Sequence, residues 1–177
     1  MKVLVKIILA LVGVIALFLV VALFVPSDYY VEREVTINKN KQEVFDYVVL
    51  LKNQDNYSVW AQMDPNMQKT FSGEDGTVGF VSAWESDHEN VGKGEQEIIG
   101  INNDRIDYEL RFLEPFEATD NAFLIVEAAG EDQTRVVWGF EGDMPYPMNA
   151  MMLFMSMEEQ LGPDLAKGLE NLKGVLE

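Results

Sequence analysis

The sequence contains no cysteine and a single histidine, His88. The lack of cysteine excludes disulfide bonds, thiol nucleophiles and thiolate metal sites. One imidazole is a poor basis for a zinc site, and His88 lies in a polar stretch typical of an exposed hairpin tip, where a catalytic base would lack a cleft. No Gly-x-Ser-x-Gly elbow, phosphate-binding loop or EF-hand spacing occurs either. The sequence therefore predicts no metal site and no cofactor.

Basic residues are also scarce, with 13 Lys and Arg against 30 Asp and Glu, for a net charge of −17. Lys2 and Lys6 are the only charges before Pro26, so the rest of the chain carries −19. Such a surface repels the phosphates of nucleic acids and anionic lipid head groups. We expect no nucleic-acid partner, and no docking on membranes through a basic patch.

The longest apolar run lies at the N-terminus. Residues 7–25 include no charged or strongly polar side chain, and at about 1.5 Å per residue a helix of this length crosses the hydrocarbon layer of a bilayer. We therefore predict a transmembrane anchor over residues 1–26. The alternative is a cleaved signal peptide, but the run exceeds the usual apolar core of about 7–15 residues and the cleavage site would be poor.

The charges around this run predict its orientation. Lys2 and Lys6 precede the run, whereas acidic residues follow it from Asp28 onward. The positive-inside rule then places the N-terminus in the cytoplasm. We expect a single-pass protein of the cell membrane whose one domain, residues 27–177, lies on the extracytoplasmic side. Tyr29 and Tyr30 stand where aromatic rings often rest at the head-group level.

Beyond residue 29 the pattern is that of strands and a few helices. Residues 30–37 alternate in polarity as a strand does, Asn38 is placed to cap a helix over residues 41–51, and a short helical turn follows over 57–61. Turn residues then separate strand-like segments with short, even spacing, which predicts an antiparallel meander. The six segments are residues 67–71, 78–85, 94–101, 105–113, 122–129 and 134–141.

The C-terminal segment predicts a long amphipathic helix. Methionines from Met148 and leucines up to Leu176 recur at intervals of three and four residues, which gives one apolar face to cover the sheet. Proline removes a backbone donor and clashes with the preceding turn, so we expect a kink or restart at Gly162-Pro163.

Several local sequences, in this order and spacing, resemble the START-like, or SRPBCC, superfamily, specifically its bacterial polyketide cyclase/dehydrase-like branch. They are NKNKQEVFDYV (38–48), WAQMDPNM (60–67), VGFVSAW (78–84), VGKGEQE (91–97), FLEP (112–115), TRVVW (134–138) and GPDLAKGLENLK (162–173). The resemblance implies an α+β helix-grip fold, in which a curved antiparallel sheet of about seven strands surrounds a long C-terminal helix and a hydrophobic cavity. It implies no single reaction. Relatives often carry a second Trp shortly after the position of Trp60, and this chain does not.

The candidate cavity residues are aromatic and methionine side chains, which supply apolar area and adapt to varied shapes. They are Trp60, Trp84, Tyr108, Phe112, Phe116, Trp138, Met148, Met151, Met152 and Met155. For any one of them, ordinary core packing is the alternative.

Polar groups inside such a cavity are candidates for proton transfer. Asp64, Tyr57 and Tyr108 are the polar residues most expected to point inward, and burial would raise the pKa of Asp64 as a general base requires. Asp64 is the catalytic candidate that we single out, with a tyrosine as the other group that could move a proton, and the alternative is that Asp64 forms a turn before Pro65.

Three functions remain open from the sequence. The first is a membrane-anchored binding protein for a lipid-like or polycyclic apolar molecule. The second is a cyclase- or isomerase-type enzyme that uses the same cavity, although no catalytic constellation is visible. The third is a membrane-tethered interaction module whose core is filled by its own side chains.

Overall fold

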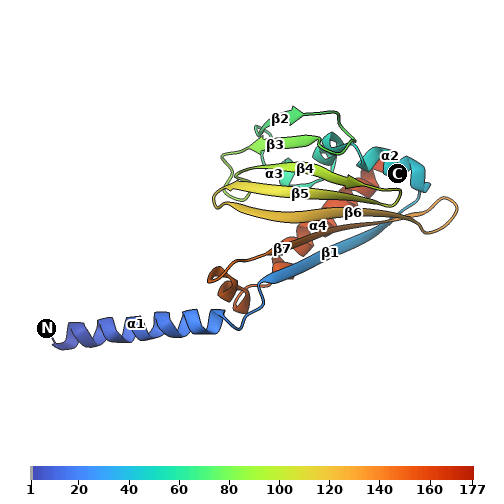
Figure 1. The fold of residues 1–177 in the computed structure, drawn as a ribbon. Coiled ribbons are helices and arrows are strands. Elements are labelled where there is room, and N and C mark those ends of the chain that lie inside the picture. The colour runs from blue at the N-terminus through green and yellow to red at the C-terminus, as the bar shows by residue number, and fades with distance from the viewer. Residues whose placement is uncertain (1) are drawn as a thin grey trace.

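The computed structural model describes residues 2–177, and its body is one antiparallel sheet of seven strands (Figure 1). The strands are β1 (Asp28–Ile37), β2 (Gln68–Ser72), β3 (Val81–Glu85), β4 (Lys93–Ile101), β5 (Arg105–Glu114), β6 (Ala118–Ala128) and β7 (Thr134–Asp143). Their order across the sheet is β1-β7-β6-β5-β4-β3-β2, so only β1 joins out of sequence. The predicted meander of about seven strands is confirmed.

The helices lie on one face of this sheet or project from it. They are α1 (Lys2–Ala22), α2 (Lys41–Val48), the 3-10 helix η1 (Leu51–Asn56), α3 (Val59–Met63), the 3-10 helix η2 (Met148–Leu153) and α4 (Met157–Leu176). α4 runs behind the sheet along β1 and β7, and α2 and α3 close the remaining part of the same face (Figure 1). This is the predicted α+β helix-grip fold.

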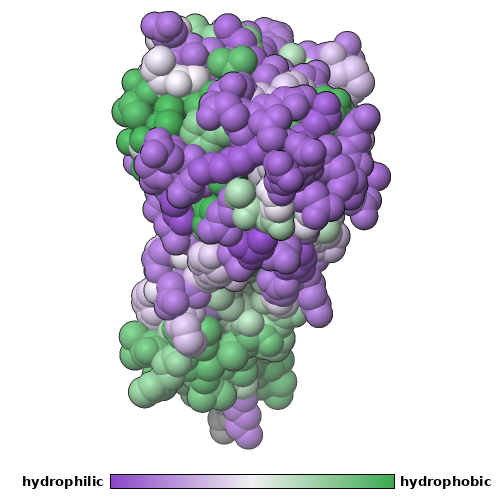
Figure 2. Space-filling model, turned by 90° about the vertical axis from the view of Figure 1, so that its right-hand side faces the viewer, coloured by the Kyte–Doolittle hydropathy of each residue, from purple (hydrophilic) through white to green (hydrophobic). Residues whose placement is uncertain are grey.

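α1 extends away from the sheet as a free rod (Figure 1). It is the one helix among the described residues that is long and apolar enough to cross a membrane, over Val3–Ala22, and of its large apolar side chains none is buried in the domain. Figure 2 shows the contrast between this hydrophobic base and the mostly hydrophilic domain above it.

Two predicted boundaries move for local reasons. The strand expected from residue 78 begins at Val81, because Gly79 adopts a φ of +91° that a strand does not allow. The helix expected over 41–51 ends at Val48, and η1 follows, where the Asp75 carboxylate accepts from the backbone N–H of Leu51 at 2.7 Å. The helix cap is Asn40, two residues later than the predicted Asn38, and it accepts from the N–H of Glu43 at 3.0 Å.

The long C-terminal helix predicted from Met148 is wrong at its start. The methionine segment forms η2, which packs against α1, whereas α4 begins at Met157 and packs against β1. One straight helix cannot serve both partners, so the chain turns between them. Of the kink or restart expected at Gly162-Pro163, the restart is absent, because α4 continues through Pro163. Glu159, whose carbonyl loses its partner at Pro163, is exposed, and water can bond it.

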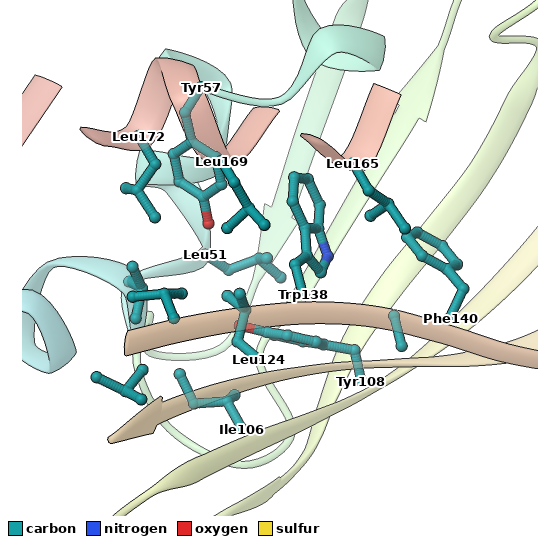
Figure 3. Close-up of a cluster of buried hydrophobic side chains, with 14 of the residues drawn as sticks. Leu51, Tyr57, Ile106, Tyr108, Leu124, Trp138, Phe140, Leu165, Leu169 and Leu172 are labelled. Atoms are coloured by element: carbon teal, nitrogen blue, oxygen red, sulfur yellow. The ribbon is translucent and has the colours of Figure 1, made fainter. Parts of the chain in front are cut away.

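The core lies where α4 crosses the sheet (Figure 3). Leu165, Leu169 and Leu172 of α4 are fully buried in the same apolar cluster as Trp138 of β7. α4 comes this close because Gly168 has no side chain, and a Cβ there would lie 2.7 Å from Cζ3 of Trp138. This contact therefore sets the distance between helix and sheet.

Replacing Leu169 with Ala should lower the free energy of unfolding by about 2–5 kcal/mol, because it removes a buried side chain and leaves a cavity. Urea unfolding of the full chain, followed by tryptophan fluorescence, measures the change. Val175→Ala is the matched control, because Val175 is an exposed residue of the same helix, and it should change stability by about 0.5 kcal/mol or less. Equal effects of the two changes would contradict the packing of α4.

Candidate functional site

A cavity of about 330 Å³ lies between the concave face of the sheet and the layer formed by η1, α3 and α4. Small-molecule sites in proteins commonly measure about 300–1,000 Å³. Fully buried side chains such as Tyr108, Ile106 and Leu124 fill the concave face beyond one end of the cavity. The other end, near the start of β1, is walled by half-exposed residues, and this is the cavity mouth.

Aromatic rings form most of the apolar wall. Trp60 of α3 meets Trp138 and Phe140 of β7 edge to face, with ring centroids 5.9 and 5.7 Å apart. At the mouth, Trp84 of β3 packs on Phe112 of β5 at 6.1 Å, above Gly94, which stands between them in the sheet. The cavity thus offers flat apolar surfaces in two places, around Trp60 and, at its mouth, around Trp84.

One row of residues across the sheet brings polar groups into the same cavity. In the strand register Ser82 stands opposite Gln96, Gln96 opposite Leu110, and Leu110 opposite Asp120. The row ends at β1, where Tyr29 stands opposite Gly142. The side chains of these residues, from Ser82 to Tyr29, all line the cavity, and Gly142 has no side chain. We call Tyr29, Ser82, Gln96 and Asp120 the polar row.

Tyr29 and Asp120 meet above Gly142. A Cβ at Gly142 would overlap Oδ1 of Asp120 and lie 2.6 Å from the Tyr29 hydroxyl, so only glycine leaves room for the pair. The Tyr29 hydroxyl donates to the Asp120 carboxylate. Burial, followed by the charge of Asp120 and this hydrogen bond, raises the pKa of Tyr29 above its ordinary value. Burial also raises the pKa of Asp120, against the opposing effect of hydrogen bonds from Tyr29 and the Asp143 N–H.

Gln96 is the most unusual member of the row. Only 7% of Gln96 is exposed, and its side-chain amide has no hydrogen-bond partner within residues 2–177. The amide atoms are nevertheless accessible from the cavity, unlike the fully enclosed and unpartnered Trp138 Nε1, and they offer two donors and an acceptor there. The cavity wall therefore holds a polar group whose hydrogen bonds have to come from whatever fills the cavity.

Four of the ten predicted cavity residues lie on the cavity wall, namely Trp60, Trp84, Phe112 and Trp138. Tyr108 is instead fully buried in the core, one row deeper than the polar row, where its hydroxyl has no partner (Figure 3). Phe116 is 71% exposed in the turn between β5 and β6. The remaining four, which the structure places in or just after η2 beside α1, are Met148, Met151, Met152 and Met155.

The environment expected for Asp64 is wrong. Asp64 is half-buried outside the cavity, and its carboxylate accepts from the Ser86 hydroxyl at 2.5 Å and the Asn66 N–H at 2.8 Å. The Ser86 hydrogen bond comes first among the causes that lower the pKa of Asp64, which is opposite to what a buried general base requires. The alternative, a turn around Pro65, describes its role. Tyr57 is buried in the core, its ring edge on Trp138 at 5.6 Å.

Sequence reasoning missed the polar row, although a signal for it existed. In β6, Asp120 lies on the same face of the strand as Ala122 and Leu124, and in β4 Gln96 lies on the same face as Ile98. Each is a polar residue in an otherwise apolar alternation. Tyr29 was placed at the lipid head groups but faces the cavity. Within residues 2–177, no three His, Asp or Glu side chains gather closely enough to hold a metal ion.

Asp120→Asn should raise the melting temperature at pH 7. The folded pKa of Asp120 is raised, so its support for the fold exists below the unfolded pKa of about 3.9 and is lost as the pH rises through the folded value. Asparagine imitates the protonated form and still accepts from Tyr29. The advantage of the variant should therefore disappear toward pH 3 in a series of thermal melts.

Asp64→Asn is the control with the opposite sign. A lowered pKa means that Asp64 supports the fold above about pH 4 and loses this effect on acidification, so this variant should melt lower at pH 7. A lower melting temperature for Asp120→Asn at pH 7 would contradict the described environment of Asp120.

Comparison with known proteins identifies the fold. No family model and no curated protein sequence matches the chain. Among solved structures, norcoclaurine synthase from Thalictrum flavum is 11% identical with a TM-score of 0.63, over 88% of this chain and 90% of the synthase. A hypothetical protein from Helicobacter pylori is 14% identical with a TM-score of 0.62, over 85% and 89%. Ara h 8.0201 is 15% identical with a TM-score of 0.51, over 84% and 97%.

These identities are too low to carry an activity from one protein to another, and what they share is the arrangement of sheet and C-terminal helix. The match extends over nearly the full length of each neighbour. The chain therefore has the helix-grip fold of START-like proteins.

Proposed function

We propose that this chain is a membrane-tethered binding protein that holds an amphipathic small molecule in its cavity. Residues 1–26 are the anchor and residues 27–177 the binding domain. The observation that carries the proposal is the cavity itself, which is walled by Trp60, Trp84 and Trp138 and onto which the amide of Gln96 opens without a partner in the protein. Aromatic walls suit an apolar body, and the polar row suits a hydroxyl, carbonyl or amine on that body.

The two parts of the cavity act differently on a ligand. Apolar burial supplies affinity, at about 25 cal/mol per Å² before the costs of association. The polar row supplies selectivity, because a molecule without a polar group would displace water from the Gln96 amide and give it no hydrogen bond in return. A lipid or polycyclic molecule with one polar end meets both requirements.

The location follows from the anchor. α1 is apolar over a membrane-crossing length, with Lys2 and Lys6 before its apolar run and acidic residues after it. The positive-inside rule then puts the domain outside the cytoplasm. A tether of this kind keeps the cavity where amphipathic molecules concentrate.

A second candidate is an isomerase- or cyclase-type enzyme, which the Tyr29–Asp120 pair favours. A carboxylate and a phenol that share a proton beside a bound molecule have the reach for general acid–base chemistry. The resemblance to the polyketide cyclase/dehydrase-like branch points the same way. The interaction module with a filled core is less favoured, because the cavity has a volume of about 330 Å³.

Native mass spectrometry of the full chain, purified from its membrane and released from detergent, tests the binding proposal. The wild type should carry one apolar molecule in a reproducible mass, which solvent extraction then identifies. Gln96→Leu should lower its occupancy about tenfold, since losing one buried hydrogen bond costs about 1.4 kcal/mol. Gln160→Leu, the same change at an exposed position of α4, should leave it unaltered.

Equal loss in both variants, or a wild type that never carries a ligand, would count against the site. Asp120→Asn separates the two functions. An enzyme would keep its bound molecule in this variant but accumulate substrate in place of product, whereas a binding protein would show the same molecule in both forms.

A further inference from the structure

One segment of this acidic chain is free of charge. Between Met144 and Met157 there is no charged residue, although the chain has 30 acidic side chains. This segment contains η2, and several of its apolar side chains are exposed, with Phe154 85% exposed. Together with two residues that follow α1, they form a surface that we call the collar: Leu23, Phe24, Met148, Met151, Leu153 and Phe154.

The collar is fixed to the end of α1. The Asn149 side chain donates to the carbonyl oxygens of Ala22 and Val25, both at 2.8 Å, and the Tyr146 hydroxyl donates to that of Leu19 at 3.4 Å. Ala22 is 1% exposed as a result. The last carbonyls of a helix lack the regular intrahelical partner, and inside a bilayer no water can supply one. The Ala22 carbonyl accepts only a long bond from the Val25 N–H at 3.4 Å, and Asn149 adds a shorter one.

The length of α1 sets the depth of this contact. Lys6 is the last charge before the apolar run, and long basic side chains reach back to the membrane surface. From there, residues 7–22 of α1 rise about 24 Å, against a hydrocarbon thickness of about 30 Å. Ala22 then lies about 6 Å inside the far border of the hydrocarbon layer. η2, which is bonded to Ala22, lies at that border.

We propose that the collar inserts into the bilayer at the acyl-chain border of the leaflet beside the domain. The inference rests on the anchor of the proposed function and adds a second membrane contact to it. The partner is the apolar layer of the lipids and not their head groups, because the domain is strongly acidic and the collar carries no charge. Insertion therefore requires no anionic lipid.

This contact orients the cavity. α1 leaves the domain on the side where β1 begins, and the turn between β5 and β6 lies at that same end of the sheet (Figure 1). The cavity mouth, with Trp84 and Phe112, is at this end too. A collar held in the bilayer thus turns the mouth toward the membrane surface, with exposed Phe116 beside it. Molecules can then pass between bilayer and cavity by a short route.

The absence of cysteine allows a direct test. Single cysteines replace Phe154, Phe116, Val12 or Val175 in the full chain, each at an exposed position, and receive a nitroxide label. The labelled proteins are placed in nanodiscs of phosphatidylcholine alone. Spin-label accessibility to oxygen, which concentrates in the bilayer, is compared with accessibility to a water-soluble nickel complex.

At Phe154 oxygen should be the better relaxant by severalfold, as at Val12 in the middle of α1. At Val175, near the far end of α4, the nickel complex should be better, and Phe116 should fall between these limits. If the label at Phe154 is relaxed better by the nickel complex, as at Val175, while the label at Val12 is relaxed better by oxygen, then the collar does not insert into the bilayer but α1 still spans it. If Val12 is also in water, the anchor fails and the collar fails with it. An immersed Phe154 with a fully aqueous Phe116 would overturn the orientation of the mouth.

Discussion

The contact between Gly168 of α4 and Trp138 of β7 governs how the concave face of the sheet is used. It lets the helix lie directly on the sheet, and the leucines that follow Gly168 seal one end of that face. Toward its N-terminal end α4 contributes Met157 and Leu161, which line the cavity without filling it. One helix therefore both closes the core and leaves a cavity, and the aromatic walls and the polar row occupy the part that stays open.

The polar row has a cost in the free protein. The Gln96 amide has no partner in the protein and faces a largely apolar cavity, and the burial of Asp120 works against its ionised form. Apolar residues at both positions would make a more stable sheet. Groups that reduce stability and face a cavity are typical of sites where a ligand completes their hydrogen bonds. The room that Gly142 leaves for Tyr29 and Asp120 fits the same interpretation.

Much of the fold could be predicted from the sequence because strand alternation and turn residues are local signals. The predicted ends of the strands lie within a few residues of the observed ends, except that β6 begins four residues earlier than expected, at Ala118. The methionine repeat was misleading, since the same spacing serves packing against α1 as well as against a sheet. Local sequence patterns could not show which polar side chains come together in the folded sheet. Tyr29 and Asp120 are far apart in the chain and meet only through the pairing of β1 with β7 and of β7 with β6.

An experimental structure of the full chain, purified from its own membrane without added ligand, would test the account most directly. We predict continuous electron density in the cavity, with a polar atom within about 3 Å of the Gln96 amide and an apolar body against Trp60 and Trp84. A cavity closed by rearranged side chains, with Gln96 bonded to its own protein, would contradict the central claim that this domain binds an amphipathic molecule.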